Sequence, residues 1–85
     1  MQITTAGNVE VPAYLVLIAR GYDVSHSGAD GDQWWARKDD DSFSAESPLM
    51  LLGLVTMSES RGSNWQATDA EIHAFLETFP GAGQR

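Results

Sequence analysis

The stretch DQWWARKDDDSFS, Asp32 to Ser44, places two adjacent tryptophans ahead of three aspartates. Its apolar residues lie on both sides of an Asp-rich turn, which is typical of two antiparallel strands. On an extended backbone successive side chains point to opposite faces, so Trp34 and Trp35 cannot both enter the same core. The sequence therefore predicts a strand pair with one tryptophan on each face.

The turn between these strands fixes which residues face each other. A two-residue turn at Asp39 and Asp40 pairs Lys38 with Asp41, Arg37 with Ser42, Ala36 with Phe43, Trp35 with Ser44 and Trp34 with Ala45. This register gathers the apolar side chains Trp34, Ala36, Phe43 and Ala45 on one face. A one-residue slip would pair Phe43 with Arg37, so the hydrophobic pattern selects the first register. A longer loop stays open, because aspartate tolerates a positive φ less well than glycine does.

The segment upstream of Gln33 supplies a third strand. Tyr22 and Val24 alternate with Asp23 and Ser25, and the Gly-rich loop at residues 27–32 then returns the chain. This period of two predicts a three-stranded antiparallel meander between residues 22 and 47.

The segment NVEVPAYLVLIARGY, residues 8–22, predicts a helix. Pro12 suits a first turn, Asn8 is a candidate cap, and Gly21 stands where a left-handed terminator belongs. Helical spacing relates the apolar residues Val11, Tyr14, Leu15 and Ile18. Few polar positions remain, which favours a central helix, and a buried strand over YLVLIA is the alternative.

The segment SPLMLLGLVTMSESRG, residues 47–62, predicts a second helix. Ser47 is its N-cap and Pro48 its first residue, while Arg61 lies in the last turn and Gly62 follows it. Its apolar stripe comprises Leu51, Leu54, Val55 and Ser58, with Leu52 beside it. Gly53 in the interior suggests close packing against a neighbour.

A third helix is predicted in TDAEIHAFLETFPG. Thr68 and Glu71 have the spacing of a capping box, and Pro80 ends the helix. Its stripe comprises Ile72, Phe75, Leu76 and Phe79. Trp65 is expected in the core or stapled onto this helix, and residues 81–85 are expected to form a frayed tail.

These elements predict one small α+β domain over residues 1–85, in the order α-β-β-β-α-α. We expect a three-stranded antiparallel meander with the three helices packed on one face, since each helix must bury its apolar stripe.

Composition limits the functional classes. Twelve acidic residues against five basic ones give a net charge of −7, which disfavours nucleic acid and favours a basic partner. The range Asp23–Glu46 holds seven acids and two bases. The chain has no cysteine, which excludes disulfides and thiolate metal sites. Residues 1–11 lack a basic region followed by an apolar run, and no apolar segment approaches the roughly 20 residues of a membrane span, so we expect a cytoplasmic protein.

The second tryptophan is the best lead to a binding site. If Trp34 faces the helices, Trp35 lies on an otherwise polar face and is expected to be partly exposed. We predict partner binding by Trp35, Arg37, Asp39, Asp40, Asp41, Asp30 and Asp32. Three alternatives stay open. Residues 1–5 could cover Trp35, the acids could serve solubility alone, or the Trp35 face or an edge strand could form a homodimer.

Catalytic and metal-binding patterns are weak. His26 lies between Ser25 and Ser27, which point the opposite way in a strand, and His73 lies near Glu77 on a polar helix face. The acids lack the spacing of a calcium loop, and the histidines lack zinc-ligand spacing. We expect no enzyme activity, no cofactor and no metal.

The run Phe43–Leu76 contains P-L-x-L-L-G-L-V, an R-G-x-x-W connector and a T-D-x-E-I helix. It resembles a pattern in short uncharacterised bacterial proteins, and some small acidic proteins of similar appearance are immunity proteins that neutralise secreted toxins. The resemblance covers about two-fifths of the chain and implies a shared fold. It assigns no functional residue.

Overall fold

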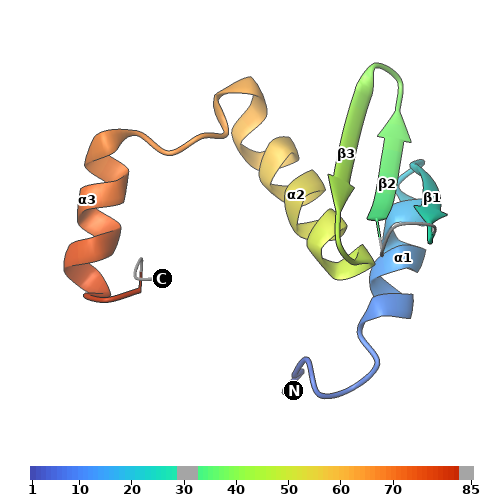
Figure 1. Cartoon of the computed structure of the whole chain (residues 1–85), viewed down its shortest axis with the longest axis horizontal. Coiled ribbons are helices and arrows are strands. Elements are labelled where there is room, and N and C mark those ends of the chain that lie inside the picture. The colour runs from blue at the N-terminus through green and yellow to red at the C-terminus, as the bar shows by residue number, and fades with distance from the viewer. Residues whose placement is uncertain (29–32, 83–85) are drawn as a thin grey trace.

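The computed structural model describes residues 1–28 and 33–82. Its elements are α1 Glu10–Ala19, β1 Asp23–Ser27, β2 Gln33–Lys38, β3 Asp41–Ala45, α2 Pro48–Arg61, the 3₁₀ helix η1 Gly62–Asn64 and α3 Asp69–Thr78. The α+β class and the predicted order are confirmed (Figure 1).

The three strands form an antiparallel sheet in the order β1-β2-β3. The predicted register between β2 and β3 is confirmed, from the pair of Lys38 and Asp41 to the pair of Trp34 and Ala45. On the other side of β2, Val24 of β1 faces Ala36. The two-residue turn requires a positive φ only at Asp39, where it is 55°. Aspartate adopts this conformation more readily than most residues, so no longer loop is needed.

Helix α1 ends as its sequence predicts. Gly21 has a φ of 91°, and its N–H donates to the Ile18 carbonyl at 2.9 Å while the Tyr22 N–H donates to Leu17 at 3.1 Å. These two bonds form a Schellman motif, which satisfies the last carbonyls of the helix and turns the chain into β1. At the start of α1, the Val11 N–H donates to Asn8 Oδ1 at 3.4 Å.

The burial of α1 differs from the expectation of a central helix. Ala13 and Leu17 are its buried residues. The predicted stripe lies on the opposite side and is exposed: Val11, Tyr14, Leu15 and Ile18. The reason is that α1 packs on α2 and β1 through one side only, so its second apolar side has no covering layer among the described residues.

Helix α2 has the predicted caps. The Met50 N–H donates to Ser47 Oγ at 3.2 Å, and Pro48 occupies the first turn. A second acceptor comes from α1, since the Leu49 N–H donates to Glu10 Oε1 at 2.9 Å. This bond joins the N-terminal ends of the two helices, and a carboxylate is also favourable at the positive end of the α2 dipole.

The core lies between the sheet and the helices α1 and α2. Its members are Leu17, Tyr22, Ala36, Ala45, Leu51 and Val55, with Val24, Trp34, Phe43, Leu52 and Leu54 packed around them. The predicted α2 stripe is therefore confirmed at Leu51 and Val55, which are fully buried. Gly53 does not mark a close approach, because a Cβ there would meet nothing within 4 Å.

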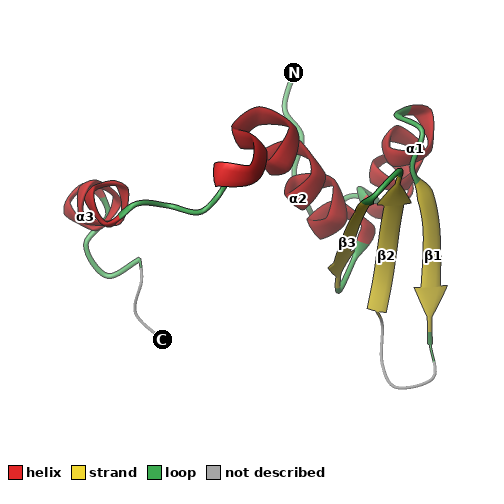
Figure 2. Ribbon diagram, turned by 90° about the horizontal axis from the view of Figure 1, so that it is seen from above, coloured by secondary structure: helices red, strands yellow, loops and turns green. Residues whose placement is uncertain are grey.

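The sequence led us to expect all three helices on one face of the sheet. That expectation is wrong for α3, which does not pack on the sheet with α1 and α2. Every residue of α3 is exposed, and the helix stands apart from the sheet in both views (Figures 1 and 2). The radius of gyration is 15.1 Å, whereas a compact chain of this length has about 12 Å. After α3, Gly81 and Ala82 are exposed, and residues 83–85 of the predicted tail lie outside the described residues.

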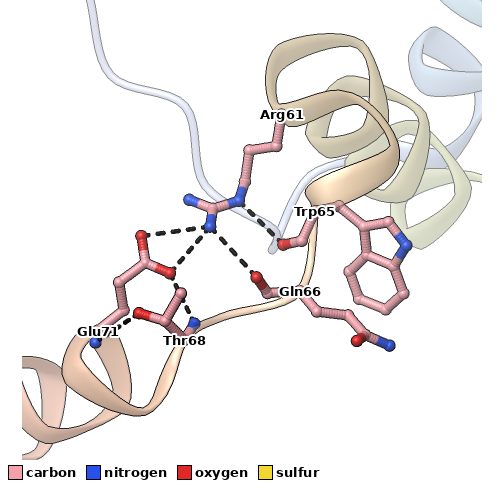
Figure 3. Close-up of polar contacts among 5 residues, drawn as sticks. All are labelled: Arg61, Trp65, Gln66, Thr68 and Glu71. Atoms are coloured by element: carbon pink, nitrogen blue, oxygen red, sulfur yellow. Dashed lines mark hydrogen bonds and ion pairs between the residues drawn. The ribbon is translucent and has the colours of Figure 1, made fainter.

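Arg61 connects the end of α2 to the start of α3 (Figure 3). Its Nε donates to the Trp65 carbonyl at 2.9 Å, and its Nη2 donates to both oxygens of Glu71 at 2.9 and 3.2 Å. The predicted capping box is confirmed, because the Glu71 N–H donates to Thr68 Oγ1 while Glu71 Oε1 accepts from the Thr68 N–H. These bonds, first the one from Thr68 and then those from Arg61, lower the pKa of Glu71. We call this set of contacts the Arg61 clamp.

Candidate functional site

The two tryptophans of β2 lie on opposite faces of the sheet, as predicted. Trp34 packs against the core on the helix side. Trp35 pairs with Ser25 of β1 and Ser44 of β3 on the other side, which we call the outer face. Helices α1 and α2 lie together on the opposite side of the sheet (Figure 2). Strand alternation directs Trp35 to the face that α1 and α2 do not cover, and its side chain is therefore partly exposed.

The side chains around Trp35 on the outer face are polar. Strand alternation places there Asp23, Ser25, Gln33, Arg37, Ser42 and Ser44. The Arg37 guanidinium carbon lies 4.9 Å from the centroid of the Trp35 ring, which is a cation–π contact. Arg37 therefore covers part of the indole but is itself exposed, so a partner could displace it at a cost of about 0.5–1 kcal/mol.

The N-terminal residues do not cover Trp35. Residues 1–9 contain no strand, and Met1 and Ile3 are exposed. The chain begins beyond the helices rather than over the strands in both views (Figures 1 and 2). The alternative of a flap formed by residues 1–5 is thus wrong in this structure.

The predicted aspartates are only partly brought together with Trp35. Asp39, Asp40 and Asp41 are exposed and form the turn at the far end of β2. Asp41 pairs with Lys38, whose Nζ donates to the Arg20 carbonyl at 2.9 Å on the helix side. Arg37 lies between Trp35 and this turn. The other two predicted residues, Asp30 and Asp32, lie outside the described residues.

The helix side of the sheet carries a hollow that the sequence reasoning missed. Its volume is about 660 Å³, and its lining comprises Glu10, Val11, Tyr14, Trp34, Glu46, Ser47 and Pro48. The His26 ring, which is not part of this lining, stacks on Trp34 with ring centroids 4.3 Å apart. The lining comes from three separate segments, so no local spacing in the sequence indicates it. The signal that could have helped is the parity of β1, which places His26 directly opposite Trp34.

Trp65 is neither in the core nor stapled onto α3. It is 45% exposed and lines a hollow of about 340 Å³ with Phe43, Leu54 and Met57. Its indole points away from the first turn of α3 (Figure 3). The Arg61 clamp holds the Trp65 carbonyl toward α3, and the side chain is directed to the opposite side.

The two histidines lie far apart in the fold, His26 in β1 and His73 in α3 (Figure 1). Within residues 1–28 and 33–82, no group of three or more His, Asp or Glu side chains is placed to hold a metal ion. In the same residues no helix has the length and apolar character needed to cross a membrane.

The chain matches no protein-family model, and no curated protein or solved structure gives a significant match. The geometry of the outer face is therefore the basis for a functional assignment.

Proposed function

We propose that this chain is a non-catalytic protein-binding module that binds a basic protein through the outer face of its sheet. The observation that supports it is the partly exposed indole of Trp35 on a face that neither α1 nor α2 covers. Tryptophan is enriched among the few residues that contribute about 2 kcal/mol or more at protein interfaces. An indole beside serine and arginine side chains offers apolar area together with hydrogen-bonding groups around it.

The charge of the chain supports a basic partner. The net charge is −7, and the exposed residues Asp39, Asp40 and Asp41 lie at the β2–β3 turn, at one end of the sheet. Such a field raises the rate of encounter with a cationic surface, while buried aromatic contacts mainly slow dissociation. With the resemblance of Phe43–Leu76 to small bacterial proteins, we extend the proposal to an immunity-like role in the bacterial cytoplasm, in which the partner is a basic toxin.

The test compares two exposed tryptophans. Trp35→Ser and Trp65→Ser baits are used beside the parent chain to capture partners from a lysate of the source organism, and a captured basic protein is purified for binding measurements. We expect Trp35→Ser to weaken binding about 30-fold, which corresponds to about 2 kcal/mol, whereas Trp65→Ser binds as the parent does. Far-UV circular dichroism and urea unfolding show that each variant is folded. Equal binding by Trp35→Ser and the parent contradicts the proposal.

The charge contribution is tested separately on the same purified partner. The triple variant Asp39→Asn, Asp40→Asn, Asp41→Asn keeps the turn but removes three charges. We expect a slower association rate with a weaker dependence on salt and a nearly unchanged dissociation rate. An association rate equal to that of the parent at low salt would show that these acids serve only solubility.

A further inference from the structure

Helix α3 has no covering partner within the described part of the chain. It has ten residues, all exposed. An isolated helix of this length is marginal in water, because nucleation is costly and most helical stability in proteins comes from packing an apolar side. The capping box and the Arg61 clamp stabilise only its first turn. A second surface is therefore needed to hold α3 in its helical form.

The side of α3 that lacks a partner is apolar. Its stripe comprises Ile72, Phe75, Leu76 and Phe79, each between 40% and 54% exposed. The rings of Phe75 and Phe79 contact each other with centroids 5.3 Å apart. The residues at i, i+3, i+4 and i+7 form one continuous strip along the helix, which we call the α3 stripe.

A matching strip lies uncovered on α1 of the same chain. It comprises Val11, Tyr14, Leu15 and Ile18, each between 37% and 56% exposed, and we call it the α1 stripe. These residues also have the spacing i, i+3, i+4 and i+7. The chain thus carries two uncharged helical strips of equal length, and each has the size and shape to cover the other.

The α3 stripe does not reach the α1 stripe of its own chain in this arrangement. Helices α1 and α3 lie on opposite sides of α2 in both views (Figures 1 and 2). The Arg61 clamp fixes the first turn of α3 to the end of α2 and directs the helix away (Figure 3). Gly62, with a φ of 70° and a ψ of −152°, turns the chain outward at the same point.

We infer that two copies of this chain exchange their α3 helices, so that each α3 stripe packs on the α1 stripe of the other copy. A large side chain carries roughly 200 Å² of surface, about half of which is exposed at these positions. Two reciprocal contacts of eight side chains each would therefore bury roughly 1,600 Å². This is the area of a standard stable interface.

The absence of cysteine from the chain allows a direct test by crosslinking. Leu15→Cys and Phe75→Cys are introduced in separate copies that carry tags of different size, because both positions lie in the middle of their stripes. The copies are mixed at micromolar concentration and oxidised. We expect a disulfide-linked heterodimer on a non-reducing gel, and we expect the same product from a pair that also carries Trp35→Ser. That last variant separates this inference from the proposed function.

A chain with both substitutions distinguishes exchange from closure within one copy. Leu15→Cys together with Phe75→Cys is expected to give covalent dimers rather than internally crosslinked monomers. A control pair of Ile3→Cys with Phe75→Cys, with Ile3 exposed but outside both stripes, is expected to crosslink at least tenfold less. A predominantly monomeric disulfide product, or crosslinks only between two Leu15→Cys copies or two Phe75→Cys copies, overturns the inference.

Sedimentation of the parent chain provides an independent readout. We expect a dimer at micromolar concentration, and we expect Leu15→Glu and Phe75→Glu each to yield monomers because a charge enters the contact. Ile3→Glu is the matched control and should remain dimeric. A parent chain that is monomeric at hundreds of micromolar, or a Phe75→Glu variant that dimerises as well as the parent, contradicts the exchange.

Discussion

Alanine substitution at two glycines of the α2 region should change stability in opposite directions. At both Gly53 and Gly62 an added Cβ would meet nothing within 4 Å, so sterics with other side chains cannot distinguish them. Gly53 lies inside α2, where alanine is favoured over glycine by about 1 kcal/mol. Gly62 has a φ of 70° and a ψ of −152°, a region that is almost restricted to glycine and costs other residues about 1–3 kcal/mol.

The expected magnitudes follow from these conformations. Gly53→Ala should raise the free energy of unfolding by about 1 kcal/mol. At Gly62 alanine also restricts the unfolded chain, which offsets about 0.4–1 kcal/mol of the strain. From the middle of the two ranges, Gly62→Ala should lower the free energy of unfolding by about 1.3 kcal/mol. The two positions are nine residues apart, and the double variant should show nearly additive effects.

Urea unfolding followed by far-UV circular dichroism measures both variants, and an unchanged slope with denaturant shows that the comparison is valid. The reasoning is refuted if Gly62→Ala is as stable as the parent or more stable, because the chain would then not leave α2 through the glycine conformation. A destabilised Gly53→Ala would show that α2 has a close neighbour at that position.

Three further predictions concern the core and two titrating groups. Leu51→Ala should lower the free energy of unfolding by about 3 kcal/mol, because Leu51 is fully buried. Met50→Ala, at an exposed position of the same helix, should change the free energy of unfolding by less than about 1 kcal/mol. Urea unfolding of both variants tests this difference. Burial, and then the Glu59 carboxylate, raises the pKa of Tyr22 above 10.0. Ultraviolet titration should therefore give a higher pKa for Tyr22 than for free tyrosine. Because the unfolded chain loses this proton first, the free energy of unfolding should fall as pH rises past 10. The lowered pKa of Glu71 contributes stability above pH 4.5 that is lost as pH falls through the lower folded value, and nuclear magnetic resonance should show the start of α3 fraying in acid.

The strand register could be predicted because it rests on local rules. A two-residue turn leaves few ways to pair β2 with β3, and only one of them separates Phe43 from Arg37. The ends of α1 and α2 were predictable for the same reason, since Ser47 and Gly21 act on backbone groups within a few residues. The partial exposure of Trp35 follows from parity once Trp34 is assigned to the core.

The surface on which each apolar helical stripe packs could not be predicted. A stripe indicates that a helix needs a packing partner, but it does not identify that partner. On α1 the sequence favoured the strip containing Leu15, yet the smaller strip with Ala13 and Leu17 packs inside the chain. Small residues permit close approach to α2 and β1, and this packing depends on the geometry of the whole layer. Likewise, the hollow beside Trp34 draws on three segments and required the structure.

Helix α1, which carries the α1 stripe, lies on the side of the sheet opposite the outer face, so packing of a second copy's α3 on the α1 stripe leaves Trp35 free to bind. A dimer formed in this way would carry two partner sites and a net charge of twice −7. Its own contact is apolar and is opposed by like-charge repulsion, so added salt should strengthen the dimer. The encounter of Asp39, Asp40 and Asp41 with a basic partner depends on attraction, so the same salt should slow partner binding. Salt dependence measured by sedimentation and by association kinetics therefore separates the two surfaces. If both processes weakened with salt, the stripes would not be the contact that holds two copies together.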